Sequence, residues 1–246
     1  MIKMKMNHLF MAGAVLLGTG ALAALTNPAL AEEKSVTTTG DVTFVEDTET
    51  VPPVDPTDPD ETVDPEEPGE GTSGPLSIDY ASNFHFDKQK ISAKDEIYYA
   101  LSDNITTADG KEARPHWVQV TDKRGTNAGW KLQVQQAAQF TTGQDEDAKE
   151  LKGAQIKMTN TSVATTSDNK SAAPTPAETV TLTPTGAAQD VMTAQTDEGM
   201  GTWLNVFGTG QKGDQSISLS VPGTSEKVKD GKYTTELTWL LNDTPA

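Results

Sequence analysis

Residues 129–135 read Gly-Trp-Lys-Leu-Gln-Val-Gln, so the apolar residues Trp130, Leu132 and Val134 alternate with polar ones. Because successive side chains of a strand point to opposite faces, this stretch predicts a strand with one apolar face. The same alternation recurs, between turn signals, at Leu76/Ile78/Tyr80, Val118/Val120, Val180/Leu182, Ile217/Leu219/Val221 and Leu237/Trp239/Leu241. Many short strands of this kind predict an all-β sandwich or barrel-like domain over residues 75–246.

The turn Asp122-Lys-Arg-Gly125 lies between two of these runs and predicts a β-hairpin. Trp203 lies in Gly201-Thr-Trp-Leu-Asn-Val-Phe207, which has apolar residues on both faces and therefore predicts a buried central strand. Trp117, beside His116, is expected as a surface contact or a rim residue.

Composition narrows the range of functions. The 246 residues include 36 acidic and 19 basic side chains, a formal charge of −17. This charge argues against binding of nucleic acid or of an anionic membrane, since both need a basic face. With no cysteine and three histidines, the chain lacks disulfides, thiolate metal sites and a cysteine nucleophile, and we expect neither a metal nor a cofactor.

The N-terminal residues resemble a secretion signal. Lys3 and Lys5 precede an apolar stretch over residues 9–25, and Ala29 and Ala31 follow in an A-x-A arrangement. This pattern predicts a signal peptide over residues 1–31, which includes the expected signal helix. A retained membrane anchor is the alternative, but Asn27-Pro28 favours cleavage, so we expect a secreted protein without a membrane span.

Two segments separate the signal peptide from the predicted domain. Within residues 32–45, the β-branched and aromatic residues around Val42 and Phe44 predict one short strand, which we expect to dock on the domain. Residues 46–74 are rich in proline and acids, and up to Glu70 they contain no basic residue. This composition predicts an extended, disordered, acidic spacer.

Each W-x-L triplet forms an apolar ridge on one face of its strand. The candidate binding residues, or alternatively core ridges, are Trp130, Leu132, Tyr233, Leu237, Trp239 and Leu241. In the core interpretation these side chains fill the domain interior. In the binding interpretation the Trp rings are exposed and stack on sugar rings, or an apolar groove receives a strand of a partner.

The C-terminal segment fits Y-x-x-x-L-T-W-x-L-x-x-x-P from Tyr233 to Pro245, and Gly129-Trp-Lys-Leu132 supplies a first W-x-L. Together with the signal peptide, the Pro/Asp-rich segment and the domain start at Gly74-Pro-Leu-Ser-Ile-Asp79, this layout resembles the WxL domain surface proteins of Gram-positive bacteria. The resemblance implies a secreted cell-surface protein that binds peptidoglycan non-covalently, with WxL-interacting surface proteins as further partners. It implies no catalytic activity.

The sequence also weighs against an enzyme. Acids such as Asp79, Asp122, Asp190 and Asp197 lie in no recognisable hydrolase motif, and there is no G-x-S-x-G nucleophile elbow. The absence of an L-P-x-T-G sorting motif favours non-covalent wall attachment. The alternative function is a subunit of a cell-surface complex, or an adhesin, that binds a partner surface protein or a host component.

Overall fold

The structure is a computed structural model that describes residues 34–107, 110–144, 147–209 and 214–243. The expected signal peptide lies outside these residues. Among them, no helix is long and apolar enough to cross a membrane. The described elements are strands, which confirms the all-β prediction.

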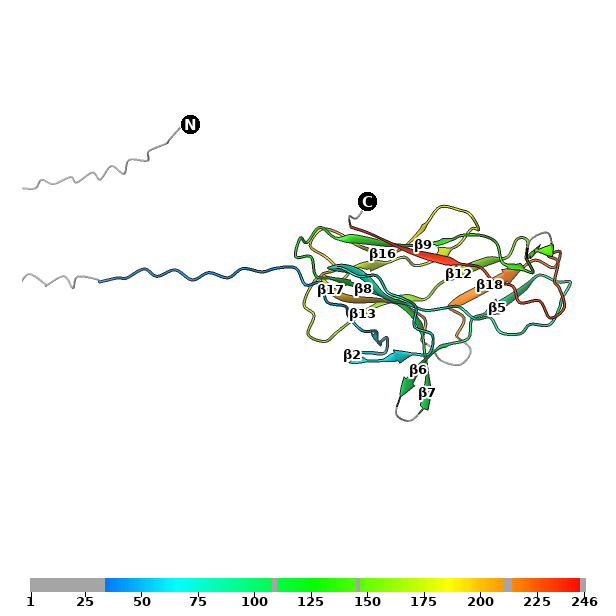
Figure 1. Cartoon of the computed structure of the whole chain (residues 1–246), viewed down its shortest axis with the longest axis horizontal. Helices are drawn as coiled ribbons and strands as arrows, with labels where there is room; N and C mark the ends of the chain where they lie inside the picture. The colour runs from blue at the N-terminus through cyan, green and yellow to red at the C-terminus, as the bar shows by residue number, and fades with distance from the viewer. Residues whose placement is uncertain (1–33, 108–109, 145–146, 210–213, 244–246) are drawn as a thin grey trace, which may run out of the picture. The chain divides into compact units, whose positions relative to one another are not determined.

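Three four-stranded antiparallel sheets, which we call sheets I, II and III, enclose the main core (Figure 1). Sheet I has the order β13 (Thr161–Thr165), β17 (Gly201–Phe207), β8 (His116–Asp122), β4 (Leu76–Ala81). Sheet II has the order β14 (Thr175–Pro176), β16 (Gln189–Ala194), β9 (Trp130–Gln136), β19 (Leu237–Asn242). Sheet III has the order β15 (Val180–Thr181), β12 (Gln155–Met158), β18 (Ile217–Val221), β5 (Glu96–Tyr99). A further pair, β10 (Thr141–Thr142) and β11 (Lys149–Glu150), follows β9 in sequence.

The main core is built by the alternation that the sequence shows. Along β9, Trp130, Leu132 and Val134 are buried, while the residues between them are half-buried. Val118 and Val120 of sheet I, and Ile156 and Leu219 of sheet III, belong to the same buried cluster. Because all three sheets contribute one apolar face, the domain has a closed interior rather than a flat two-layer one.

Sheet I is buried on both faces. All seven residues of β8 are buried, and the side of sheet I that faces away from the main core contacts a second cluster: Val54, Tyr80, Ile105, Trp117, Leu204 and Val206. Trp117 is fully buried in it, with its ring centroid 4.3 Å from that of Tyr80. The surface or rim position expected for Trp117 is therefore wrong. Trp203, at 4 % exposure in the main core, confirms the buried central strand.

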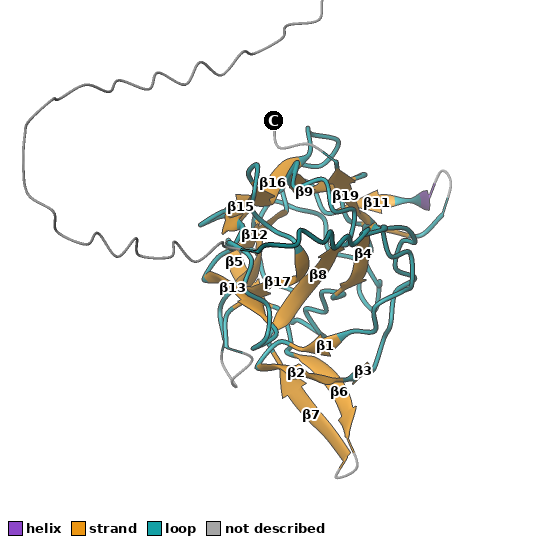
Figure 2. Ribbon diagram, turned by 90° about the vertical axis from the view of Figure 1, so that its left-hand side faces the viewer, coloured by secondary structure: helices purple, strands orange, loops and turns teal. Residues whose placement is uncertain are grey.

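Five short strands cover this outer side of sheet I: β1 (Val54–Asp55), β2 (Asp58–Thr62), β3 (Asp64–Pro65), β6 (Asp103–Thr107) and β7 (Gly110–Arg114). In Figure 2 they lie together below β8 and β17, and the β6–β7 hairpin projects from the domain. Strands β1 to β3 come from the acidic, Pro-rich stretch. The expectation of a disordered spacer is therefore wrong for residues 54–65.

The acidic stretch can pack because its buried groups find partners. Asp55, whose side chain is 7 % exposed, lies 2.7 Å from the guanidinium of Arg114. The backbone N–H of Val54 donates to Gln119 Oε1 at 2.9 Å. Charge compensation from Arg114 offsets the desolvation of the carboxylate, which the composition alone does not reveal.

Two further expectations differ from the structure. Residues 34–53 form no strand, and Phe44 and Val45 are exposed in a compact unit that begins at Thr43. The Asp122–Gly125 turn does not close a hairpin, because it leads from β8 of sheet I to β9 of sheet II. Arg124 clamps this turn by donating to both carboxylate oxygens of Asp122.

Candidate functional site

The two W-x-L triplets lie side by side although more than a hundred residues separate them in the sequence. β9 and β19 pair antiparallel, with Leu241 opposite Leu132 and Trp239 opposite Val134. Directly opposed residues in such a ladder point to the same face. Both ridges therefore face inward, and the ladder joins them into one apolar surface.

The first triplet is part of the core. Trp130 and Leu132 are fully buried, and Trp130 Nε1 donates to the carbonyl oxygen of Gly199 at 3.0 Å. Gly199 has a φ of +75°, and a Cβ there would lie 2.6 Å from Trp130 Nε1. The indole thus packs against a backbone that only glycine allows. Neither Trp130 nor Leu132 is accessible to a ligand.

The second triplet is only half-buried. Leu237, Trp239 and Leu241 pack against the main core from β19, the edge strand of sheet II. Tyr233 is also half-buried, and its hydroxyl donates to Glu226 O and accepts from Val228 N, each at 3.0 Å. This anchors the loop that leads into β19. Of the predicted site residues, Tyr233, Leu237 and Trp239 line a groove, whereas Leu241 does not.

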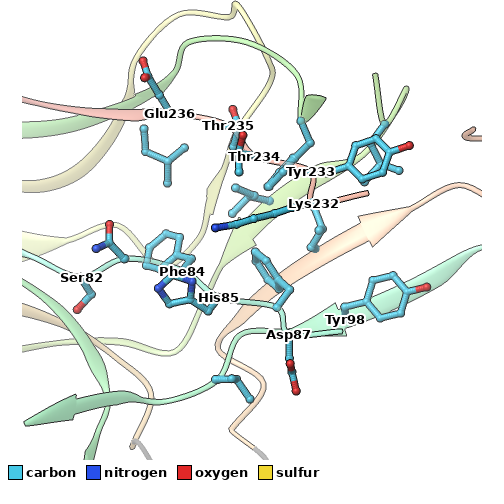
Figure 3. A pocket seen from close by; sticks show the side chains of 18 of the residues that line it. Ser82, Phe84, His85, Asp87, Tyr98, Lys232, Tyr233, Thr234, Thr235 and Glu236 are labelled. Carbon is cyan, nitrogen blue, oxygen red and sulfur yellow. The ribbon is translucent and has the colours of Figure 1, made fainter. Parts of the chain in front are cut away.

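The groove has a volume of about 1380 Å³ (Figure 3). One wall is the segment after β4, residues 82–91, and the other is residues 227–239. Phe140, Leu151, Ile156 and Leu219 of the main core form its floor. The unpaired side of β19 flanks it, because β19 hydrogen-bonds only to β9 among the described strands. Thr72 covers part of the edge of β4, since its N–H donates to Ile78 O at 2.8 Å.

Aromatic side chains line the groove from both walls. Phe84 and Phe86 extend from one wall and Tyr233 from the other, as Figure 3 shows for the labelled Phe84 and Tyr233. Phe86 contacts Phe140 edge to face, with ring centroids 6.5 Å apart. Tyr98 of β5 is a further aromatic residue that lines the groove (Figure 3). Aromatic faces of this kind bind the C–H faces of sugar rings or apolar side chains.

Charged groups of both signs surround these rings. The lining includes Lys88, Lys90, Lys227 and Lys232 as well as Glu70, Asp87, Asp230 and Glu236. His85 Nε2 lies 2.9 Å from Glu67 Oε2 at the rim. In a chain of charge −17, equal numbers of lysines and carboxylates make the groove less acidic than the protein as a whole.

The sequence argument missed Phe84, Phe86 and Tyr98. The run Asn83-Phe-His-Phe-Asp87 has apolar residues at alternate positions, but it forms no strand and contains no W-x-L triplet. An unusual concentration of aromatic residues just after a predicted strand was the available signal. Within the described ranges, no cluster of His, Asp and Glu could hold a metal ion.

The strands and the aromatic groove define an all-β binding domain. The model of the family described as WxL domain surface cell wall-binding matches residues 31–245, nearly the whole chain, so the chain belongs to this family. It is therefore a protein of the cell wall and cell surface, with a cell-wall-binding role. Comparison with curated proteins and with solved structures gave no match.

Proposed function

We propose that the protein is non-catalytic and binds the glycan of peptidoglycan in the groove between residues 82–91 and 227–239. The observation that supports this site is that the half-buried Trp239 lines the same groove as Tyr233 and Phe84, above an apolar floor. Exposed aromatic faces and mixed polar groups together suit a ligand that has both C–H faces and hydroxyls.

The carboxylates of the groove support a binding role. Glu70, Asp87, Asp230 and Glu236 are all exposed. A catalytic acid for glycoside cleavage usually has its pKa raised by an apolar, enclosed environment. Exposed acids in a strongly acidic chain are instead typical of surface charge, which favours binding without turnover.

A second candidate is binding of a partner surface protein. The specific observation in its favour is that β19 is an edge strand that turns an unpaired side toward the groove. An extended peptide can add to such an edge through backbone hydrogen bonds. The two candidates make different predictions for the isolated wall components.

The experiment is a pull-down of the mature protein with purified peptidoglycan, deproteinised wall and a surface-protein extract. We expect retention by peptidoglycan and a loss of about ten-fold in affinity for Trp239→Ala, since the indole supplies a large part of the apolar contact. Asn242→Ala is the matched control, because Asn242 is exposed on the opposite face of β19 and does not line the groove. Circular dichroism must show that both variants are folded.

The outcomes separate the candidates. Binding only to the protein extract would replace the glycan by a protein partner. Release of soluble sugar from peptidoglycan would contradict the non-catalytic role. If Trp239→Ala is folded and binds normally, the groove is not the binding site.

A further inference from the structure

The exposed large apolar side chains of the described residues are concentrated in two regions. One is the N-terminal segment, and the other surrounds β5 and the far end of the groove. The first group is Val36, Val42, Phe44 and Val45; the second is Ile91, Ile97, Tyr99, Leu101 and Val228. Met200 is the remaining member. Exposed apolar groups gathered in this way mark interaction surfaces.

We propose that residues 41–45, the donor segment, add as a strand to the free edge of β5 in a second copy of the chain. The segment reads Asp-Val-Thr-Phe-Val, and its β-branched and aromatic residues favour strand formation. It forms no strand in the isolated chain, and Phe44 is 89 % exposed. An extended segment that favours strand formation but has no neighbouring strand can pair with the free edge of a β-sheet.

Strand β5 offers such an edge. It is the last strand of sheet III and pairs with β18. Ala100 N–H donates to Ile217 O, on the β18 side, whereas Leu101 N–H donates to His85 O. Because backbone groups alternate in direction along a strand, the N–H groups of Ile97 and Tyr99 point away from β18. Its sequence, Glu-Ile-Tyr-Tyr, lacks the lysine or proline that often protects an edge.

The side chains match in spacing. Ile97 and Tyr99 are two residues apart and 59 % and 37 % exposed, so both lie on the outer face of sheet III. Val42 and Phe44 have the same separation. An added donor strand in register places its two apolar side chains beside those of β5, which buries all four.

Phe44 cannot reach β5 of its own chain while the contacts of Lys123 with Asp47 and Glu49 are intact. Lys123 Nζ lies 2.8 Å from Asp47 Oδ2 and donates to Glu49 O at 2.6 Å. Phe44 precedes Asp47 by three residues, which allows it to move only about 10 Å from that anchor. Lys123 follows the Asp122 end of β8, and β8 is about 20 Å long.

Strand β5 lies toward the other end of β8. Ser82 N–H donates to Trp117 O, and Leu101 N–H donates to His85 O, so the chain beside β5 is linked to the His116 end. Figure 1 shows β5 and β18 at one end of the domain, beyond β8. A second copy therefore supplies the donor. Since donor and acceptor differ, the contact is head-to-tail and extends into chains or rings.

Cross-linking tests this directly, because the chain has no cysteine. A Val42→Cys chain is mixed with an Ile97→Cys chain under mild oxidation, and a Phe44→Cys chain with a Tyr99→Cys chain. The matched control is a Thr43→Cys chain mixed with the Ile97→Cys chain, since the side chain of residue 43 points to the opposite face of the donor strand. We expect intermolecular disulfides about ten times more abundant than in the control, given the geometry that a disulfide requires.

Sedimentation of the full mature protein provides the second measurement. We expect association that rises with protein concentration and with salt, because salt screens the repulsion between strongly acidic chains. Phe44→Asp, on the donor, and Ile97→Pro, on the edge, should each weaken association about ten-fold without changing the melting temperature appreciably.

Two outcomes would overturn the proposal. One is a wild-type protein that is monomeric at every concentration, together with cysteine-variant mixtures that give no more disulfide than the Thr43→Cys control. The other is a Val42→Cys/Ile97→Cys double variant that forms its disulfide only within one chain, which would mean that the segment docks on its own domain.

Discussion

Asp55 and Arg114 form an ion pair that joins the acidic, Pro-rich stretch to the β6–β7 hairpin, with 2.7 Å between Asp55 Oδ2 and Arg114 Nη2. Burial raises the pKa of Asp55, but hydrogen bonds from Thr57 and the neighbouring Arg114 outweigh burial, so the net pKa lies below its usual value. The carboxylate is therefore charged at neutral pH and needs its partner. Through this pair, strands far apart in sequence close over the outer side of sheet I.

Removal of the guanidinium should destabilise the protein. We expect Arg114→Ala to lower the free energy of unfolding by about 2 to 3 kcal/mol, because Asp55 is left buried without its counter-charge. Chemical denaturation measures the change. Lys111→Ala is the control, since Lys111 pairs with Glu66 at the surface, and we expect its effect to be under about 0.5 kcal/mol. Equal effects of the two substitutions would contradict a structural role for the Asp55–Arg114 pair.

The second buried cluster predicts which N-terminal residues the fold requires. A chain that starts at Val51 retains β1 to β3 and should melt at nearly the same temperature as one that starts at Glu32, because the described residues that it lacks are exposed and their ion pair with Lys123 lies at the surface. A chain that starts at Pro75 uncovers part of the cluster around Trp117 and should be clearly less stable. Calorimetry of the three chains distinguishes these cases. If the shortest chain is as stable as the others, the β1–β3 layer does not contribute to the fold.

The sequence predicted the part of the fold that depends on local alternation. Trp130, Leu132 and Val134 recur at period two because one face of β9 is buried. Trp117 escaped prediction because the alternation of Val118 and Val120 assigns it to the face that also carries Gln119 and Thr121, and that polar face is buried as well. The packing of Val54 and Asp55 depends on Gln119 and Arg114, which lie about sixty residues further along the chain. No local pattern carries that information.

The candidate site was predicted only in part for a similar reason. The W-x-L triplets indicated two apolar ridges, but which ridge is accessible depends on strand order. β9 lies between β16 and β19, whereas β19 is an edge strand. The facing wall, with Phe84 and Phe86, follows a different strand of a different sheet, so the sequence alone could not place it beside Trp239.

The contact between Trp130 and Gly199 gives a prediction for the first triplet. Gly199→Ala should destabilise the protein by about 2 to 4 kcal/mol, because the new methyl group would overlap both the indole and Ala194 at a backbone φ that disfavours alanine. Trp130→Ala should cost about 3 to 5 kcal/mol through the cavity that it leaves. Gly125→Ala is the control, since Gly125 also has a positive φ but has open space around it. Urea denaturation should rank Gly199→Ala well above Gly125→Ala, and the reverse order would contradict the packing described for Trp130.

His116 should make stability depend on pH below neutrality. Its ring packs edge to face on Phe84 at 5.2 Å, and burial lowers its pKa to about 4 from an unfolded value near 6.5, against the opposing influence of Asp103 and Asp214. Between these two values the unfolded chain binds more protons than the folded one, so stability falls as the pH decreases. We expect His116 to contribute a loss of about 2 kcal/mol between pH 7 and pH 5.

The measurement is the free energy of unfolding of the wild type and of His116→Phe at pH 7, 6 and 5. Phenylalanine keeps an aromatic ring against Phe84 but has no proton to gain, so the variant should show a much flatter pH dependence over this interval. Restricting the range to pH 5 and above keeps Asp55, whose pKa is lowered, in its charged form throughout. If the free energy of unfolding depends on pH equally in the two proteins, the pKa of His116 does not differ between the folded and unfolded states.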